Sequence, residues 1–152
     1  MCGVAGFWNK SCSISAEDMR VIIQKMTTSI AHRGPDDEGA WVNASEGIAL
    51  GHRRLSIIDL SPEGHQPMCS ADGRYVVSFN GEIYNYLEIR RELEQVGHRF
   101  RGNSDTEVML ASFCQWGVEQ SLLRFNGMFA FALWDVKTHA LYLARDRLGE
   151  KP

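Results

Sequence analysis

Several features that mark large classes of proteins are missing from this sequence. No apolar run approaches the roughly 18 residues that a membrane-spanning helix needs. Lysine and arginine are scattered and the net charge is −3, so no basic surface for nucleic acid is indicated. The first residues, MCGVAGFW, lack the basic segment of a secretory signal peptide. We therefore expect a cytoplasmic protein without a membrane or nucleic-acid partner.

Cysteine pairs are missing as well. The four cysteines form no C-x-x-C pair, and in a reducing compartment they are expected to be free thiols, not a disulfide framework. His65 and Cys69 come nearest to a metal-binding spacing, but a tetrahedral site needs three or four ligands. The sequence therefore predicts no metal site. Repeats, low-complexity segments and linkers are also missing, which favours one domain over residues 1–152.

The pattern that is present is typical of an α+β domain. Short β-branched or aromatic runs predict strands at 3–8, 39–43, 47–52, 54–59, 74–80, 126–135 and 140–146. Helical spacing and the capping residues Ser15, Asn85 and Ser104 predict helices over 15–30, 85–96 and 104–117. Asp72-Gly73 predicts a hairpin turn, and Asn80-Gly81 is expected to end its strand. Successive strands favour antiparallel sheets with helices packed on them.

The cysteine at position 2 has a distinctive chemical context. Removal of Met1, which a small following side chain permits, would leave Cys2 with a thiol and an α-amine on one carbon. The ordinary pKa of an α-amine is about 7.7–8.0, so the uncharged amine can accept a proton near neutral pH. A nucleophile needs such a base. Taken alone, the position also fits an incidental or an acylated cysteine, and a retained Met1 would remove the base.

The motifs after Cys2 occur in a characteristic order. They are MCGVAGFW, AHRGPDDEGAW, LGHRRLSIIDLS, GHQPM, FNGEIYNY, GNSDTEVML, NGMFAFALWD and ARDRLGEKP, and together they run through the whole chain. In this order they resemble the glutaminase half of class II glutamine amidotransferases, and specifically of glutamine-dependent asparagine synthetases. The resemblance implies an N-terminal-nucleophile hydrolase fold, an αββα sandwich of antiparallel sheets. It also implies that residues 1–152 are a type 2 glutamine amidotransferase domain.

The resemblance implies roles for individual residues. Cys2 is the expected nucleophile, with its own α-amine as the base. The side-chain amide of Asn80 and the backbone N–H of Gly81 form the expected oxyanion hole. Arg54 is expected to bind the α-carboxylate of glutamine and Asp105 its α-ammonium. The other residues expected to contact or shape the substrate pocket are Leu55, Ser56, Ile57, Ile58 and Glu82.

Neighbouring charged residues carry weaker expectations. Residues 33–36 are expected near the mouth of the site, where they help to seat Cys2. Arg53 is expected to be a solvated surface residue. Asp105, at the start of a helix, could also compensate the helix dipole, and the two roles can coexist.

The expected reaction is hydrolysis of L-glutamine to glutamate and ammonia through a cysteine thioester. In the family that the sequence resembles, ammonia passes to a C-terminal synthetase domain that binds ATP and Mg²⁺, which has no counterpart in these residues. No cofactor is therefore expected in this domain, and the chain is expected to be truncated at its C-terminus. The expected partners are L-glutamine, the synthetase domain and, in an assembly, a second copy of the chain.

Three other interpretations stay open on the sequence. An N-terminal-nucleophile amidohydrolase could act on another amide, although Arg54 and Asp105 together suit an amino-acid head group. A glutamine-binding module could lack catalysis. The ammonia acceptor could belong to a sugar or polysaccharide pathway, in which related amidotransferases have similar N-terminal halves. LSIIDLS and RDRLGEKP point away from glucosamine-phosphate synthase and the purine-pathway amidotransferase.

Overall fold

A computed structural model describes residues 1–56 and 61–151 of the chain. The first of its two sheets has the strand order β1 (Gly3–Trp8), β3 (Ile48–Arg54), β2 (Asp37–Asn43). The second has the order β4 (Met68–Cys69), β5 (Tyr75–Ile83), β6 (Gly127–Asp135), β7 (Ala140–Arg145). All neighbouring strands pair antiparallel, as the sequence predicted.

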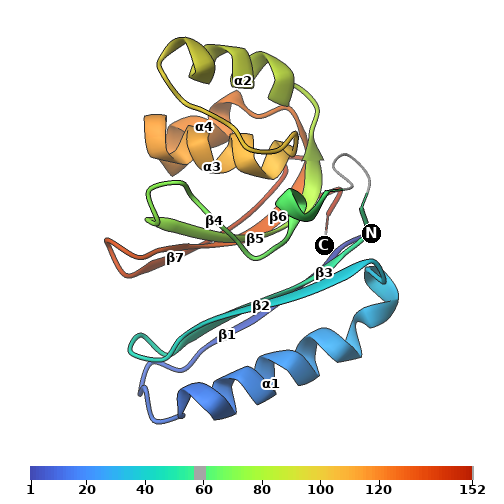
Figure 1. The fold of residues 1–152 in the computed structure, drawn as a ribbon, viewed down its shortest axis with the longest axis vertical. Helices are drawn as coiled ribbons and strands as arrows, with labels where there is room; N and C mark the ends of the chain where they lie inside the picture. Colours follow the sequence, from blue (N-terminus) through green and yellow to red (C-terminus); the bar gives the residue numbers. More distant parts are fainter. Residues whose placement is uncertain (57–60, 152) are drawn as a thin grey trace.

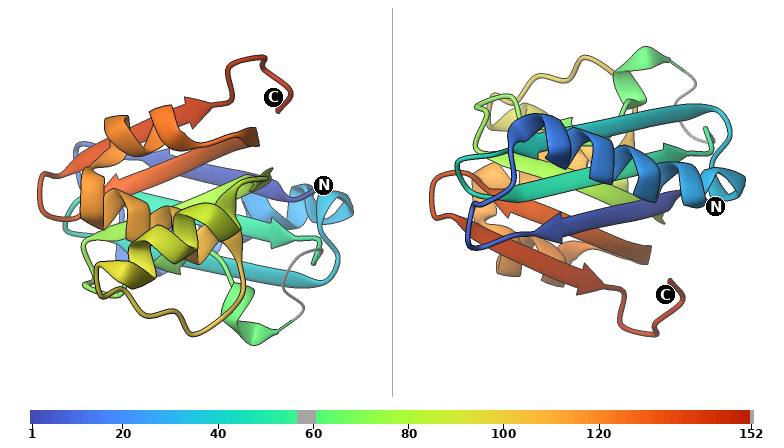
Figure 2. Two further views of the ribbon diagram at one scale, coloured as in Figure 1. Left: turned by 90° about the horizontal axis from the view of Figure 1, so that it is seen from above. Right: turned by 90° about the horizontal axis from the view of Figure 1, so that it is seen from below.

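Helices cover the outer face of each sheet. Helix α1 (Ala16–Ser29) lies on the first sheet, and α2 (Tyr86–Gln95), α3 (Asp105–Trp116) and α4 (Val118–Arg124) lie on the second. Two short 3₁₀ helices, η1 (Ala31–Arg33) and η2 (Pro62–Gly64), occupy the loops after α1 and β3. The order of layers is helix, sheet, sheet, helix (Figures 1 and 2). The predicted αββα sandwich is therefore confirmed.

Alternating side chains on β3 form the core on both faces of the first sheet. Ile48 and Leu50 face the second sheet, whereas Ala49 between them packs against α1. The buried cluster between the sheets consists of Ile48, Leu50, Val76, Ala132 and Trp134. At Gly51 a Cβ atom would clash with the side chain of Thr27, so glycine allows α1 to lie close to the strand.

Two polar contacts join the sheets near one end of this cluster. The hydroxyl of Ser78 donates to the carbonyl oxygen of Gly51 at 2.9 Å. His52 Nε2 lies 2.9 Å from the carbonyl oxygen of Phe79. Since a carbonyl can only accept, Nε2 carries the proton. Burial lowers the pKa of His52 from 6.5 to about 4, so the ring is neutral at pH 7.

The predicted caps have mixed outcomes. Ser15 and Ser104 are confirmed, because their hydroxyls accept hydrogen bonds from Asp18 N and Glu107 N at 3.1 and 3.2 Å. Asn85 is wrong as a side-chain cap of α2. Its side chain instead donates to the carbonyl of Arg124 and accepts from Asn126 N, which ties the start of α2 to the end of α4.

Two strand predictions are also corrected. Asn80-Gly81 does not end its strand: β5 continues to Ile83, and Gly81 pairs with Phe129. A Cβ atom at Gly81 would overlap the backbone of β6, so close strand approach, not a turn, explains this glycine. The strand expected at 54–59 is wrong in its described part, because β3 ends at Arg54 and residues 55–56 are not in a strand. The sequence also missed β4 and α4.

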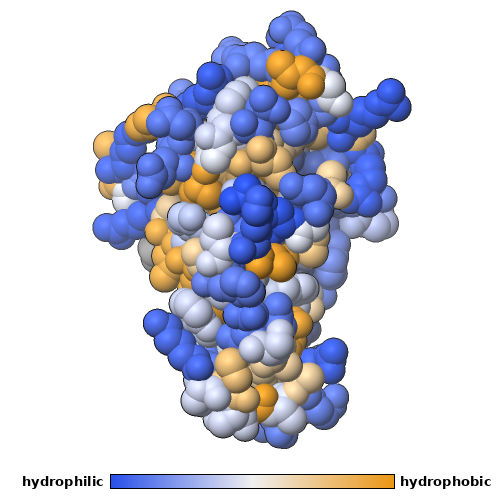
Figure 3. Space-filling view, turned by 90° about the vertical axis from the view of Figure 1, so that its left-hand side faces the viewer, coloured by the Kyte–Doolittle hydropathy of each residue, from blue (hydrophilic) through white to orange (hydrophobic). Residues whose placement is uncertain are grey.

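Polar and apolar residues are distributed unevenly over the surface. On the face shown in Figure 3, hydrophilic residues predominate and apolar residues form small, separate patches. Within the described ranges, no helix has the length and apolar character that would let it cross a bilayer.

Candidate active site

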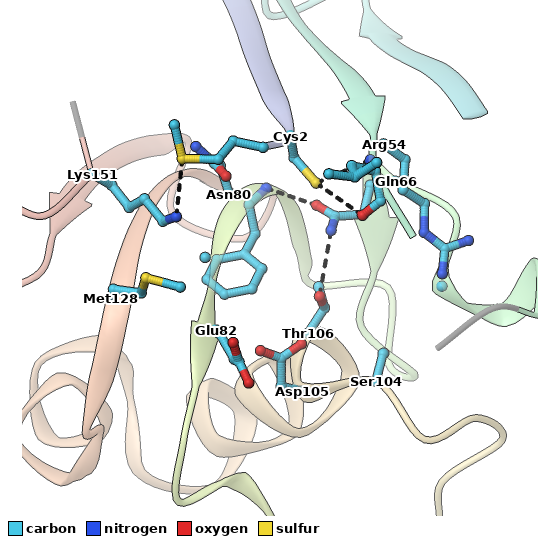
Figure 4. A pocket seen from close by; sticks show the side chains of 15 residues that line it. Cys2, Arg54, Gln66, Asn80, Glu82, Ser104, Asp105, Thr106, Met128 and Lys151 are labelled. Atoms are coloured by element: carbon cyan, nitrogen blue, oxygen red, sulfur yellow. Dashed lines mark hydrogen bonds between the residues drawn. The ribbon is translucent and has the colours of Figure 1, made fainter. Parts of the chain in front are cut away.

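Cys2 lies immediately before β1, and contacts from two other segments hold it there. The backbone N–H of Leu55 donates to Cys2 Sγ at 3.4 Å, and Sγ lies 3.6 Å from the carbonyl oxygen of Leu55. Arg33 Nε donates to the carbonyl oxygen of Cys2 at 3.2 Å. The predicted seating role of the loop that contains Arg33 is therefore confirmed. The thiol faces a cavity of about 160 Å³ (Figure 4).

The walls of this cavity come from both sheets and from α3. Cys2 precedes β1, and Arg54 is the last residue of β3. Because these two strands of the first sheet run antiparallel, the start of β1 and the end of β3 lie at the same edge of the sheet. Asn80, Gly81 and Glu82 come from β5 of the second sheet. The predicted site residues that line the cavity are Cys2, Arg54, Leu55, Asn80, Gly81, Glu82 and Asp105. Residues far apart in the sequence thus meet around one volume.

One predicted residue in the described part of the chain, Ser56, is not among those that line it. Ser56 lines an adjacent depression, and its backbone N–H donates to Asp36 Oδ2 at 2.8 Å. Asp36 N in turn donates to the carbonyl oxygen of Arg54 at 3.0 Å, so this aspartate orders the chain on both sides of Leu55. Ile57 and Ile58 lie outside the described residues.

The position of Arg54 depends on a glycine that the sequence did not single out. Arg54 is buried, and its Nη1 donates to the carbonyl oxygen of Ser61 at 3.0 Å. A Cβ atom at Gly64, in η2, would overlap the guanidinium group of Arg54. Gly64 therefore provides the space that the arginine fork occupies.

The neighbouring arginine behaves differently from its prediction. Arg53 is not solvated: its side chain is 14% exposed and pairs with Glu38 at 2.6 Å. Its Nε donates to the carbonyl oxygen of Thr27 at 3.1 Å, near the end of α1. Because side chains alternate along β3, Arg53 points to α1 while Arg54 points to the cavity.

Asp105 is the first residue of α3 and is only 5% exposed. Its Oδ2 accepts a hydrogen bond from Ile83 N at 2.9 Å. Burial raises the pKa of Asp105 from 3.8 to about 6, the backbone hydrogen bonds oppose this rise, and the charge of Glu82 adds to it. A cationic group in the cavity would favour the ionised form.

Gln66 is a cavity residue that the sequence missed. It is buried, and its Oε1 accepts from the backbone N–H of Phe79 at 2.7 Å. Its Nε2 donates to Thr106 Oγ1 at 3.4 Å (Figure 4). Gln66 therefore ties β5, one residue before Asn80, to α3, one residue after Asp105. The signal was its place in GHQPM, which periodicity alone assigned to a loop.

The segment after β7 brings a lysine to the same cavity. Lys151 is 5% exposed, and its Nζ lies 3.5 Å from Met1 Sδ. The carboxylate of Asp146 accepts the backbone N–H groups of Phe129, Leu148, Glu150 and Lys151 at 2.9–3.1 Å. Burial alone would raise the pKa of Asp146, but these donors hold it at about 2. The charged carboxylate thus organises the turn that positions Lys151.

Metal ligands do not gather at this site. Among residues 1–56 and 61–151, no three histidine, cysteine, aspartate or glutamate side chains are placed to hold a metal ion. The chemistry available in the cavity is that of a thiol, a side-chain amide and charged groups of both signs.

Comparisons with known proteins match the whole length of the chain. The family model for the glutamine amidotransferase domain matches residues 1–152. Glutamine-hydrolysing asparagine synthetase 1 from Bacillus subtilis is 45% identical over 152 residues, which cover 100% of this chain and 23% of that protein. A putative glutamine-hydrolysing asparagine synthetase from Mycobacterium tuberculosis is 44% identical over 163 residues, which cover 100% of this chain and 25% of that protein. The chain therefore spans about a quarter of the length of these relatives.

A solved structure has a similar fold. The glutamine phosphoribosylpyrophosphate amidotransferase from B. subtilis, complexed with ADP and GMP, matches 68% of this chain and 25% of its own, with a TM-score of 0.55. The sequences are 24% identical, so the likeness concerns the fold alone. It agrees with the predicted N-terminal-nucleophile sandwich.

Proposed function

The chain belongs to the glutamine amidotransferase domain family, and from this premise we propose that its cavity hydrolyses L-glutamine to L-glutamate and ammonia. The observation that carries the proposal is the meeting of Cys2, Arg54, Asn80, Gly81 and Asp105 around one cavity. These residues supply a nucleophile, donors for an oxyanion and two opposite charges for an amino-acid head group. No single sheet supplies all of them.

Arg54 and Asp105 bind the head group of the substrate. The guanidinium fork of Arg54 pairs with the α-carboxylate, and Asp105 pairs with the α-ammonium. Because burial disfavours the charge of Asp105, a bound ammonium offsets part of that free energy. This arrangement favours an α-amino acid over a substrate that lacks either charged group.

The reaction begins once Met1 has been removed, because a peptide bond to Met1 occupies the α-amine of Cys2. The free amine takes the thiol proton, and Cys2 Sγ attacks the amide carbon of glutamine. Asn80 Nδ2 and Gly81 N–H donate to the resulting oxyanion, and each such donor typically contributes about 3 kcal/mol to transition-state stability. The amine then protonates the leaving nitrogen, and ammonia departs as the thioester forms.

Water completes the cycle. It gives a proton to the Cys2 amine and attacks the thioester carbonyl, again with the oxyanion at Asn80 and Gly81. Collapse of this intermediate breaks the carbon–sulfur bond, returns the proton to sulfur and releases glutamate. Two further predicted residues that line the cavity, Leu55 and Glu82, contribute to the shape of the substrate pocket.

The ammonia acceptor lies in the part of the protein that this chain does not include. The relatives named above are asparagine synthetases about four times as long, so we place the acceptor in an ATP- and Mg²⁺-dependent synthetase domain of a full-length protein. A cytoplasmic location and a homodimer belong to the same proposal. A sugar- or polysaccharide-pathway acceptor is the alternative that ammonia transfer in the full-length protein would test.

The test is ammonium and glutamate release by protein whose loss of Met1 has been verified by intact mass. We expect equal amounts of both products from L-glutamine, no hydrolysis of N-acylated amines to a carboxylate and an amine, and a loss of at least about a thousandfold in Cys2→Ala. A glutamine-mimicking diazoketone should label Cys2 in the wild type. Turnover that persists in Cys2→Ala refutes the mechanism, and labelling without turnover identifies a binding module instead.

A further inference from the structure

The ammonium group of Lys151 is a buried cation in need of a partner. The residue is 5% exposed, and within the described part of the chain no carboxylate pairs with it. Its Nζ contacts the sulfur of Met1 at 3.5 Å, a weak acceptor that cannot balance a charge. Burying an uncompensated charge is costly, so this arrangement indicates an anionic ligand.

Lys151 shares the cavity with the proposed nucleophile and the proposed oxyanion donors. It lines the same cavity as Cys2, Asn80 and Gly81. In Figure 4, Asn80 and Cys2 lie between Lys151 and Arg54. The cavity therefore has a cation on each side of Cys2, with Arg54 on one side and Lys151 on the other.

The backbone that carries Lys151 is fixed. The N–H of Lys151 is one of the four donors to the Asp146 carboxylate, and Asp146 N donates to the carbonyl oxygen of Phe129 at 2.7 Å. This anchors the lysine segment to β6, the strand that pairs with Asn80 and Gly81. The ammonium is therefore attached to the same sheet as the proposed oxyanion donors.

We propose that Lys151 is a cationic group of the cavity that binds the negative charge formed at the Cys2 end: first the oxyanion and then the γ-carboxylate of glutamate. This assignment rests on the proposed function for its ligand. Removal of Met1 takes away the sulfur contact and leaves the ammonium facing the cavity. Since the side chain of glutamine is neutral, the charge favours the transition state and the product over the substrate.

The first experiment measures charge at Cys2 without requiring turnover. Iodoacetate and iodoacetamide are similar in size, and with both the Cys2 thiolate displaces iodide, but only iodoacetate is an anion. We expect Lys151→Met to lower the ratio of the iodoacetate rate to the iodoacetamide rate at Cys2 at least about threefold, because one nearby cation is removed. Lys151→Arg should retain the ratio. Peptide mass spectrometry resolves Cys2 from the other thiols.

Two controls separate charge from folding. Lys137→Met removes an exposed lysine from the turn between β6 and β7 and should leave the ratio at Cys2 unchanged. Cys12, an exposed thiol, serves as an internal reference in every variant. An unchanged ratio in a folded Lys151→Met protein overturns the proposal, whether or not glutamine is hydrolysed.

The second experiment measures the reaction itself. In Lys151→Met we expect kcat to fall about tenfold or more, KM for glutamine to stay within about twofold, and the inhibition constant of L-glutamate to rise. Lys151→Arg should recover part of kcat. A purely structural role would raise KM and lower the melting temperature together, and that result would contradict the assignment.

Discussion

The Asp105 carboxylate occupies a part of the cavity that disfavours its own charge. The unfolded chain releases this proton near pH 3.8, whereas the folded protein retains it up to about pH 6. Folding stability therefore falls as the pH rises between these values, and the ionised form costs the folded state roughly 3 kcal/mol above pH 6. A carboxylate that lowers stability while the cavity is empty is well suited to bind a ligand of the opposite charge.

Replacing Asp105 with asparagine should separate binding from stability. Asn keeps an oxygen for the N–H of Ile83 but has no charge, so we expect stability at pH 7 to be equal or higher. KM for glutamine should rise at least about thirtyfold, because a charge-assisted contact of roughly 2 kcal/mol is lost. Urea unfolding and steady-state kinetics measure the two effects. As a control, KM of the wild type should rise below about pH 6, and that of Asp105→Asn should not.

The role of Gln66 can also be tested by replacing a single side chain. Gln66→Met keeps the volume but leaves the buried N–H of Phe79 without its acceptor, which should cost about 1–3 kcal/mol of unfolding free energy. Because Phe79, which precedes Asn80, and Thr106, which follows Asp105, lose the side chain that links them, glutamine kinetics should worsen as well. Gln115→Met, at an exposed glutamine of α3, is the matched control and should change neither measurement. A Gln66→Met protein with wild-type stability and kinetics would remove this residue from the site.

Among the elements, the short η2 helix determines where Arg54 can lie. Gly64→Ala places a methyl group where the guanidinium is, so the fork must move, and we expect KM for glutamine to rise about tenfold with a smaller change in kcat. A double-mutant cycle tests the route of the effect. If Gly64→Ala acts through Arg54, adding it to Arg54→Lys should cost little more than Arg54→Lys alone. Fully additive losses would show that the methyl group acts elsewhere.

The sequence predicted elements whose cause is local and missed those whose cause is a distant partner. Ser15 and Ser104 bond to residues three positions away, so their caps could be recognised directly. Gly81 resembled a turn because its real constraint, the backbone of β6, lies 48 residues further along the chain, as its pairing with Phe129 shows. Asn85 failed as a cap because Asn126 and Arg124 compete for its amide.

The candidate site divides in the same way. Cys2, Asn80 and Asp105 could be named because ordered motifs carry them, and the structure brings all three to one cavity. Gln66 and Lys151 act through contacts that exist only after the sheets have packed. Alternation along β3 could have separated Arg53 from Arg54, but only once the strand had been extended to Arg54.

For the molecule as a whole, His52 couples the packing of the sheets to pH. Its folded pKa is about 4 against 6.5, so its neutral form contributes stability that is complete above pH 6.5 and is lost as the pH falls towards 4. We expect His52→Gln, which can still donate to Phe79, to unfold with a flatter pH dependence in this window. Urea unfolding at several pH values measures it. The comparison is best made in Asp105→Asn, because Asp105 changes stability in the opposite direction between pH 3.8 and 6.

The cavity takes one wall from each half of the sandwich, with Cys2 and Arg54 on one side and Asn80 and Asp105 on the other. A molecule that fills the cavity therefore contacts both halves and holds them together. Tightly binding inhibitors should raise the melting temperature, and this rise should grow with the logarithm of the inhibitor concentration. Bound inhibitors should also slow backbone amide hydrogen exchange in both β3 and β5, although each strand forms only part of the cavity wall.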